Sequence, residues 1–164
     1  AETVDVAQTM VQHYRAEARR VIWDLRHDAP EPQSLAAAIT SALQEMTRER
    51  GILSQVSVEG PMQPVSGELA QNLLRICQEA AANAIHHGAA RRIDVRLKYN
   101  GNGLAVTVRD DGSGFDPKTV PPGHFGLQIM RERARRFGGD LEVTSNEPTG
   151  TTVTAAIPLE AGSQ

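Results

Sequence analysis

From residue 34 onward, segments with helical periodicity are interspersed with strand-like segments, and the order of these segments constrains the fold more than any other feature. Three segments have apolar residues at helical spacing: 34–50, 67–87 and 127–137. Five shorter segments resemble strands: 55–59, 93–99, 104–109, 141–145 and 152–157. Short turns rich in glycine or polar residues join the middle pair and the last pair, as in hairpins. We therefore expect an α+β fold, a two-layer sandwich with helices on one face of a mixed, mainly antiparallel sheet.

The first 28 residues have a different pattern. Seven side chains repeat with alternating spacings of three and four: Val4, Ala7, Val11, Tyr14, Ala18, Val21 and Leu25. This spacing predicts one helix over 1–28 that packs on a partner helix, and packing on its own domain is the alternative. Pro30 and Pro32 end the pattern. We expect a linker over 29–33 and the main domain over 34–160.

Composition and charge narrow the class of partner. The chain has 164 residues, of which 40% are hydrophobic, so it is long enough to bury a core. Its formal charge is −3, its pI is about 6.0 and only 4% of its residues are aromatic. Such a chain lacks the basic surface and the stacking platforms of nucleic-acid-binding proteins, so we expect no nucleic-acid partner. The single cysteine, Cys77, suits a reducing compartment, and we expect a cytoplasmic location, with the cytoplasmic part of a membrane-bound receptor as the alternative.

Two carboxylates and two glycines follow the segment 104–109, in the run Asp110-Asp111-Gly112-Ser113-Gly114-Phe115. Glycine permits a positive φ and a close approach of the backbone to a ligand. A carboxylate at the end of a strand can accept a hydrogen bond from an exocyclic amine such as that of adenine. An ordinary hairpin turn has the same composition, so the run is either a ligand-binding loop or a hairpin turn.

A polar row runs along the helix expected over 67–87. Glu79, Asn83 and His87 are four residues apart and therefore share one side of the helix, with His86 close by. The neighbouring alanines, 80–82, are small enough for a ligand to come close. Carboxylate and amide oxygens can bind Mg²⁺ through few protein ligands, leaving the other positions to water and phosphate. A solvated helix face is the alternative.

Two further segments have glycine beside polar groups. Gly123-His124-Phe125-Gly126-Leu127 stands at the start of the helix expected over 127–137, where free backbone N–H groups make an anion site suited to phosphates. The proline-rich and glycine-rich loop over 116–125 could close over a ligand as a lid. Gly150-Thr151 leads into the last strand, where the threonine hydroxyl could meet a polar ligand.

In this order, the four motifs resemble those of the superfamily that contains histidine kinases, gyrase, chaperones and mismatch-repair ATPases, whose ATP-binding fold is of the Bergerat type. The superfamily's N-box resembles residues 78–87, and its first glycine box resembles residues 110–114. Its lid glycines match Gly123 and Gly126, and Thr151 matches the threonine of the last strand. Residues 126–134 look like the nitrate-sensor subfamily of sensor histidine kinases. Residues 17–26 resemble the end of that subfamily's second dimerisation helix.

The resemblance implies roles for residues of this sequence. Asp110 accepts the adenine amine with help from Thr151, while Gly112 and Gly114 let the backbone approach the nucleotide. Asn83 ligates Mg²⁺, and Glu79, the expected catalytic residue, orients a metal-bound water or polarises the site. The remaining implied nucleotide contacts are Gly123, His124, Phe125, Gly126 and Leu127 of the lid, with His86 and His87 of the N-box.

The resemblance also implies the reaction. It predicts the catalytic ATP-binding part of a two-component sensor histidine kinase, an enzyme with ATP and Mg²⁺ as cofactors. Such a module transfers the γ-phosphoryl group of ATP to a histidine on an upstream dimerisation helix, for relay to a response regulator in signal transduction, and works as a homodimer. We expect neither His13 nor His27 to be the acceptor, and we expect the acceptor helix to lie outside this chain. A nucleotide-switched ATPase and a non-catalytic nucleotide-binding or partner-binding module are the alternatives.

Overall fold

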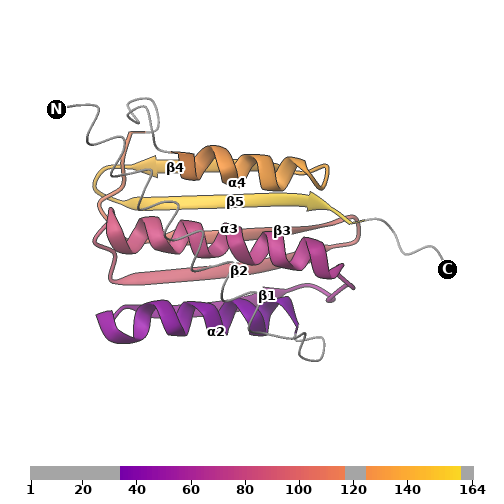
Figure 1. The fold of residues 1–164 in the computed structure, drawn as a ribbon, viewed down its shortest axis with the longest axis horizontal. Helices are drawn as coiled ribbons and strands as arrows, with labels where there is room; N and C mark the ends of the chain where they lie inside the picture. Colours follow the sequence, from indigo (N-terminus) through magenta and orange to yellow (C-terminus); the bar gives the residue numbers. More distant parts are fainter. Residues whose placement is uncertain (1–33, 117–124, 160–164) are drawn as a thin grey trace. The chain divides into compact units, whose positions relative to one another are not determined.

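The computed structural model of the protein describes residues 34–116 and 125–159 (Figure 1). In chain order the elements are α2 (Leu35–Thr47), the short 3₁₀ helix η1 (Arg48–Arg50), β1 (Leu53–Glu59), α3 (Gly67–His86), β2 (Arg92–Asn100), β3 (Gly103–Asp110), α4 (Phe125–Arg135), β4 (Asp140–Asn146) and β5 (Gly150–Pro158). The helix expected over 1–28 and the linker expected over 29–33 lie outside the described residues, so both stay predictions.

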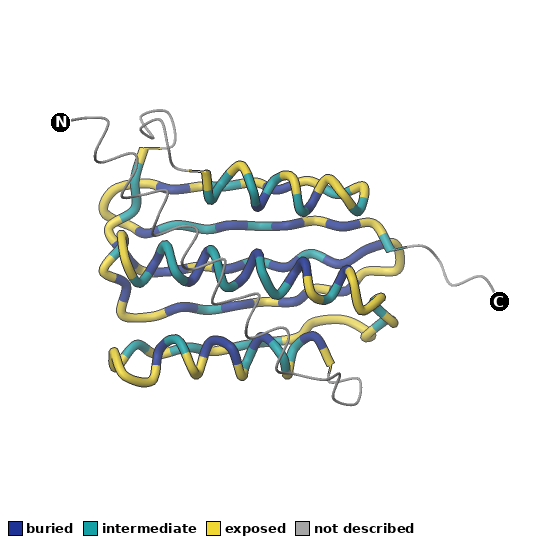
Figure 2. Tube along the Cα trace, in the orientation of Figure 1, coloured by how far each residue is buried: buried dark blue, intermediate teal, exposed yellow. Residues whose placement is uncertain are grey.

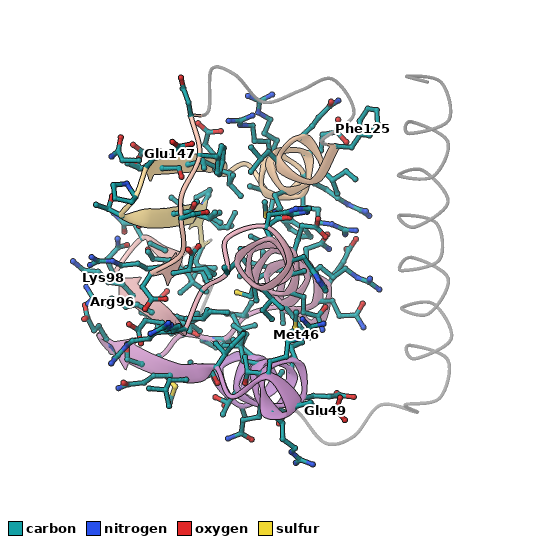
Figure 3. All side chains as sticks on the ribbon, turned by 90° about the vertical axis from the view of Figure 1, so that its left-hand side faces the viewer. Met46, Glu49, Arg96, Lys98, Phe125 and Glu147 are labelled. Carbon is teal, nitrogen blue, oxygen red and sulfur yellow. The ribbon has the colours of Figure 1, made fainter. Side chains whose placement is uncertain are left out.

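The strands form one five-stranded sheet in the order β1-β2-β3-β5-β4. β1 runs parallel to β2, and every other neighbouring pair is antiparallel. Helices α2, α3 and α4 lie on one face of this sheet (Figures 1 and 3). Arg96 and Lys98 of β2 project from the opposite face, away from the helices (Figure 3). The predicted two-layer α+β sandwich with a mixed, mainly antiparallel sheet is confirmed.

The core lies between the sheet and the helices, and the burial of each element follows its own period (Figure 2). Along β2, residues alternate between the two faces, and the buried ones are Ile93, Val95, Leu97 and Tyr99. Along α3, the buried side chains recur every three or four residues and include Leu69, Leu73, Ile76, Ala80 and Ala84. Burial of this stripe leaves the polar row of α3 beside the core instead of within it.

Local sequence explains where the helices begin and end. The hydroxyl of Ser34 accepts the N–H of Ala37, and the hydroxyl of Ser66 accepts the N–H of Leu69, so each serine satisfies one free amide at a helix start. After η1 the chain turns at Gly51, whose φ of 64° is favourable for glycine. The predicted end of the 34–50 segment at Gly51 is correct.

Several element boundaries differ from the sequence prediction by one or two residues, and two of these differences affect the site. α4 begins at Phe125 instead of Leu127, so Gly126 lies inside the first helical turn. Glycine is a weak helix former, which hid this start from a reading based on periodicity. β5 begins at Gly150 instead of Thr152, because Gly150 and Thr151 pair with Asn146 and Ser145 of β4. Cross-strand pairing of this kind has no local sequence signal.

Within the described part of the chain, none of the helices is both long enough and apolar enough to cross a membrane.

Two leucines make a matched test of this packing. Leu73 of α3 is 0% exposed and Leu53 at the start of β1 is 69% exposed. We expect Leu73→Ala to lower the free energy of unfolding by about 2–5 kcal/mol, because the core cannot close the cavity fully. Leu53→Ala should change it by about 0.5 kcal/mol or less. Urea unfolding of both variants checks this, and equal losses would contradict the burial assigned to α3.

Candidate functional site

Asp110, the last residue of β3, is the buried carboxylate of the site, with only 8% of its surface exposed. Its Oδ1 accepts the N–H of Gly112 at 2.8 Å, and the main-chain amide of Thr151 also donates to this carboxylate. Burial raises the pKa of Asp110 above its ordinary value of 3.8, and the two amide hydrogen bonds oppose that rise. The side chain is therefore held in one orientation by the start of the segment 111–115, called the glycine loop, and by β5.

The glycine loop packs directly against the end of α3. The N–H of Ser113 donates to the carbonyl of Gly88 at 2.7 Å. A Cβ on Gly112 would lie 2.6 Å from that same carbonyl oxygen and 2.8 Å from Oδ1 of Asp110, so a side chain at this position has no room. The glycine loop and the residue after the N-box-like segment 78–87 thus meet through their backbones.

The start of β5 closes the other side of the loop. Gly114 has a φ of 66°, and a Cβ there would lie 2.5 Å from the carbonyl oxygen of Asn146. Gly150, with a φ of 93°, lies so close to the carbonyl of Asp110 that it has no space for a side chain. Thr151 is placed beside Asp110 by these contacts.

Ser145 of β4 connects the same two segments and was missed by the sequence analysis. Its hydroxyl accepts the N–H of Phe115 at 2.9 Å and lies 2.8 Å from Oγ1 of Thr151. Ser145 is 6% exposed and follows Leu141 and Val143 at alternate positions, so it is a polar residue on the inward face of its strand. A polar residue at a position where the alternation calls for an apolar one was the sequence signal for the role of Ser145.

The polar row of α3 meets the start of α4. A Cβ on Gly126 would lie 2.7 Å from Oε1 of Glu79 and 3.7 Å from Nδ2 of Asn83. The structure therefore brings Gly126, which the resemblance assigns to the lid, against two of the residues expected to serve Mg²⁺ and phosphate. The first turn of α4 lies in the same region, and the N-terminal end of a helix favours an anion.

The other candidate residues occupy the rim or lie outside the described chain. His86 and His87 are exposed at the end of α3, and the N–H of His87 donates to the carbonyl of Asn83 at 2.9 Å. Phe125 is 45% exposed at the first position of α4 (Figure 3), whereas Leu127 packs against the core. Gly123 and His124 fall outside the described residues.

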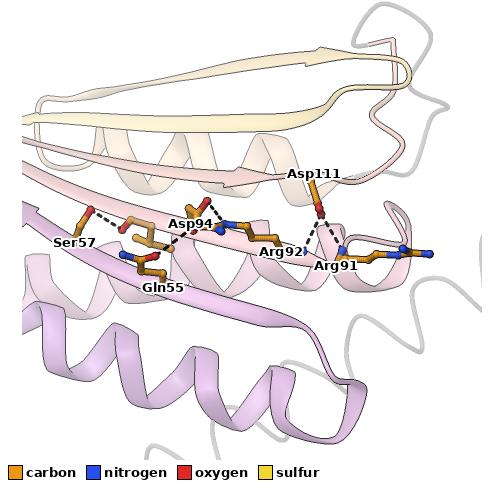
Figure 4. Close-up of polar contacts among 7 residues, drawn as sticks. Gln55, Ser57, Arg91, Arg92, Asp94 and Asp111 are labelled. Atoms are coloured by element: carbon orange, nitrogen blue, oxygen red, sulfur yellow. Dashed lines mark hydrogen bonds and ion pairs between the residues drawn. The ribbon is translucent and has the colours of Figure 1, made fainter.

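Asp111 faces away from this site. Its Oδ1 accepts the N–H groups of Arg91 and Arg92, both at 2.8 Å (Figure 4). The hydrogen bonds from Arg92 and Arg91 lower the pKa of Asp111 below its ordinary value of 3.8. This carboxylate joins the end of β3 to the start of β2, so it supports the strands that hold the site.

The donor set decides what metal the site fits. The described residues include no group of three or more His, Cys, Asp or Glu side chains able to hold a metal ion. The amide oxygen of Asn83 and the carboxylate of Glu79 are oxygen donors of the kind that Mg²⁺ accepts, since Mg²⁺ keeps several waters and phosphate oxygens in its shell. The donor chemistry of Asn83 and Glu79 therefore fits a Mg²⁺ ion that keeps most of its shell as water and phosphate oxygens.

A family model settles the class of domain. The model for the histidine kinase-, DNA gyrase B-, and HSP90-like ATPases matches residues 68–161. The chain belongs to this ATPase family. The matched range contains α3, the glycine loop, α4 and β5, which are the elements that meet at the site. An ATPase domain of this family binds ATP, so the predicted ATP ligand is supported at the level of the family.

Relatives narrow the branch of the family. DegS of Brevibacillus brevis, a signal transduction histidine-protein kinase/phosphatase, is 29% identical over 150 residues, which are 92% of this chain and 39% of DegS. The nitrate/nitrite sensor protein NarX of Escherichia coli is 31% identical over 138 residues, 84% of this chain and 23% of NarX. The resemblance to nitrate-sensor kinases is thus confirmed. This chain spans less than half the length of either relative.

A solved structure agrees with this branch. The histidine kinase domain of the Erythrobacter litoralis EL346 blue-light activated histidine kinase superposes with a TM-score of 0.59 at 30% identity. The match covers 80% of this chain and 65% of that domain.

The neighbouring carboxylates Asp110 and Asp111 should give stability changes of opposite sign with pH. Asp110 binds its proton more tightly in the folded chain, so its contribution to the free energy of unfolding falls as pH rises from 3.8 toward its raised pKa. Asp111 behaves oppositely: its contribution is present above pH 3.8 and is lost as pH falls through its lowered pKa.

Urea unfolding at closely spaced pH values measures both effects. The difference between wild type and Asp110→Asn should decrease with rising pH above 3.8, and the difference between wild type and Asp111→Asn should decrease with falling pH below it. Asparagine keeps an oxygen acceptor at each position, so each pair isolates the charge. Two curves with the same slope would refute the assigned environments.

Proposed function

We propose that this chain is the catalytic ATP-binding part of a two-component sensor histidine kinase, and that the site at Asp110, Asn83 and Gly126 holds Mg·ATP. One observation carries the proposal. Segments far apart in sequence converge at glycines: Gly112 lies against the main chain of Gly88, Gly150 against the main chain of Asp110, and Gly126 against the side chain of Glu79. Such contacts leave the polar groups Asp110, Thr151, Glu79 and Asn83 at one end of the sheet. The relatives DegS and NarX support the kinase branch.

The adenine end of the proposed site is the buried Asp110 with Thr151. Asp110 accepts the N–H groups of Gly112 and Thr151, which together hold the carboxylate in one orientation. An adenine amine is a donor, so it needs an acceptor of this kind in a place where water competes little. Thr151 completes the pocket by a hydroxyl or a bridging water, and Gly112 and Gly114 let the nucleotide lie close to the backbone.

The phosphate end is formed by α3 and α4. Asn83 would ligate Mg²⁺, and Glu79 would orient a metal-bound water or polarise the site. When bound, Mg²⁺ neutralises the charge that develops on the transferred phosphoryl group. His86, His87, the amides at Phe125 and Leu127, and the lid residues Gly123 and His124 would surround the phosphates. Phosphoryl transfer depends mainly on positioning, which is the work that these residues would share.

We place the rest of the reaction outside this chain. The acceptor histidine would lie on an upstream dimerisation helix of a homodimeric protein, and the phosphoryl group would pass to a response regulator. Residues 1–28 would be the end of the dimerisation region, 29–33 the linker and 34–160 the catalytic domain. Because the proposed substrate is ATP, we place the domain on the cytoplasmic side.

Calorimetric titration with ATP, with and without Mg²⁺, tests the metal assignment. Wild type should bind ATP more tightly when Mg²⁺ is present, and Asn83→Ala should lose about tenfold of that gain, because a ligand to the metal is gone. Asn102→Ala, in the exposed turn between β2 and β3, is the matched control and should behave as wild type. Retention of the full Mg²⁺ effect in Asn83→Ala would remove Asn83 from the site, and no ATP binding by wild type would reject the proposed function.

A second titration tests the adenine pocket. Asp110→Asn keeps the acceptor for Gly112 but turns an NH₂ group toward the adenine amine, so we expect ATP affinity to fall about a hundredfold while the domain stays folded. Asp111→Asn removes the same charge one residue away and should bind ATP within about twofold of wild type. Circular dichroism verifies folding, and equal affinities of the two variants would contradict the pocket.

A further inference from the structure

α4 contacts α3 at two places that are the same distance apart on both helices. Gly126 lies against Glu79, and NH1 of Arg133 donates to Oδ1 of Asn72 at 3.1 Å. Seven residues separate Gly126 from Arg133, and seven separate Asn72 from Glu79. Since a helix rises about 1.5 Å per residue, each interval is about 10 Å. The two helices are antiparallel, and both contacts hold only in one position of α4 along α3.

Apolar packing alone defines this position poorly. α4 has eleven residues; its fully buried residues are Met130 and Ala134, and Leu127 is only partly buried against the core. Methionine is unbranched and adapts to irregular gaps, and alanine is small, so neither side chain restricts α4 to one position along α3. A hydrogen bond is directional and has a narrow range of lengths, so it can select one position where such packing selects several.

Asn72 is suited to this selection because it is fixed on α3. It is 8% exposed, and its Nδ2 donates to the carbonyl of Glu68 one turn earlier at 2.9 Å. That bond fixes the amide plane and turns Oδ1 toward Arg133. Arg136, beyond the end of α4, also pairs with Glu68, but both side chains of that pair are more than 60% exposed. An exposed ion pair contributes little, so Asn72 and Arg133 form the contact that matters.

We propose that Asn72 and Arg133 are positioning residues for the phosphate end of the nucleotide site: their hydrogen bond sets where α4 lies along α3 and so holds Gly126 against Glu79 and Asn83. The inference rests on the proposed function. It separates the two ends of the site, because Asp110 and Thr151 make no contact with α4 among the described hydrogen bonds. A shift of α4 should therefore change phosphate binding and leave adenine binding intact.

Two arginines of α4 provide the test in the 164-residue chain. Arg133→Met keeps the aliphatic stem and removes the donor to Asn72. Arg135→Met makes the same chemical change at an arginine that is 68% exposed and lies 3.9 Å from Asp140. Affinity for Mg·ATP is measured by calorimetry, and affinity for adenosine, which has no phosphate, by NMR titration. Arg133→Met should lose about tenfold in Mg·ATP affinity with adenosine unchanged, and Arg135→Met should change both by less than about twofold.

Substitutions of Asn72 complete the series. Asn72→Leu keeps the volume without the acceptor and should reproduce Arg133→Met. Asn72→Asp keeps an acceptor for Arg133 and should retain Mg·ATP affinity within about threefold. Thermal unfolding of each variant is recorded alongside. Unchanged Mg·ATP affinity in Arg133→Met, or a parallel loss of Mg·ATP and adenosine affinity, would overturn the positioning role, the second result indicating a general structural effect.

Hydrogen exchange separates this inference from the proposed function. In Arg133→Met, amides over 125–135 should exchange faster while those of α3 keep their protection, whether or not nucleotide is present. If wild type binds neither Mg·ATP nor adenosine, the proposed function fails, and the exchange data alone decide whether the hydrogen bond positions α4. Unchanged exchange over 125–135 would reject the inference even if wild type binds ATP.

Discussion

The packing of α3 against the sheet is the interaction on which the rest of this structure depends. The buried stripe of α3, with Leu73 and Ile76 almost fully covered, fixes the rotation of the helix about its axis. That rotation turns Glu79 and Asn83 toward α4 and carries Gly88 to the glycine loop. One apolar contact surface thus orients a polar row and places a backbone carbonyl, so the core and the candidate site cannot be separated physically.

Close backbone contacts then assemble the site. Gly112, Gly126 and Gly150 each lie where a side chain would collide with a neighbouring segment, and in two of the three cases the neighbour is main chain. Main chain cannot turn away as a flexible side chain can, so these glycines are required by the packing. Gly126 differs, because its neighbour is the end of the Glu79 side chain. A substitution there would displace a functional group before it disturbed the fold.

Much of the arrangement could be predicted because the signals were local. Ser34, Ser66 and Gly51 mark helix ends by capping chemistry, and the period of burial along β2 and α3 follows from the alternation of apolar residues. Ser145, Asn72 and the carbonyl of Gly88 were missed. Their roles depend on partners 30 residues away for Ser145 and 61 residues away for Asn72, and a local pattern contains no information about such partners. Asp111 shows the same limit, because its position in the motif places it near the pocket, while its hydrogen bonds go to the start of β2.

By itself, the sequence determined the α+β class, the order of helices and strands, and the set of motifs that mark an ATPase domain, since these depend on periodicity, turn chemistry and motif order. Only the tertiary structure decided that β5 lies between β3 and β4, that Gly126 is inside α4, and that Arg133 meets Asn72. Strand order and helix position arise from contacts between distant segments. Their free energies come from the packing of whole surfaces, which no single segment of sequence encodes.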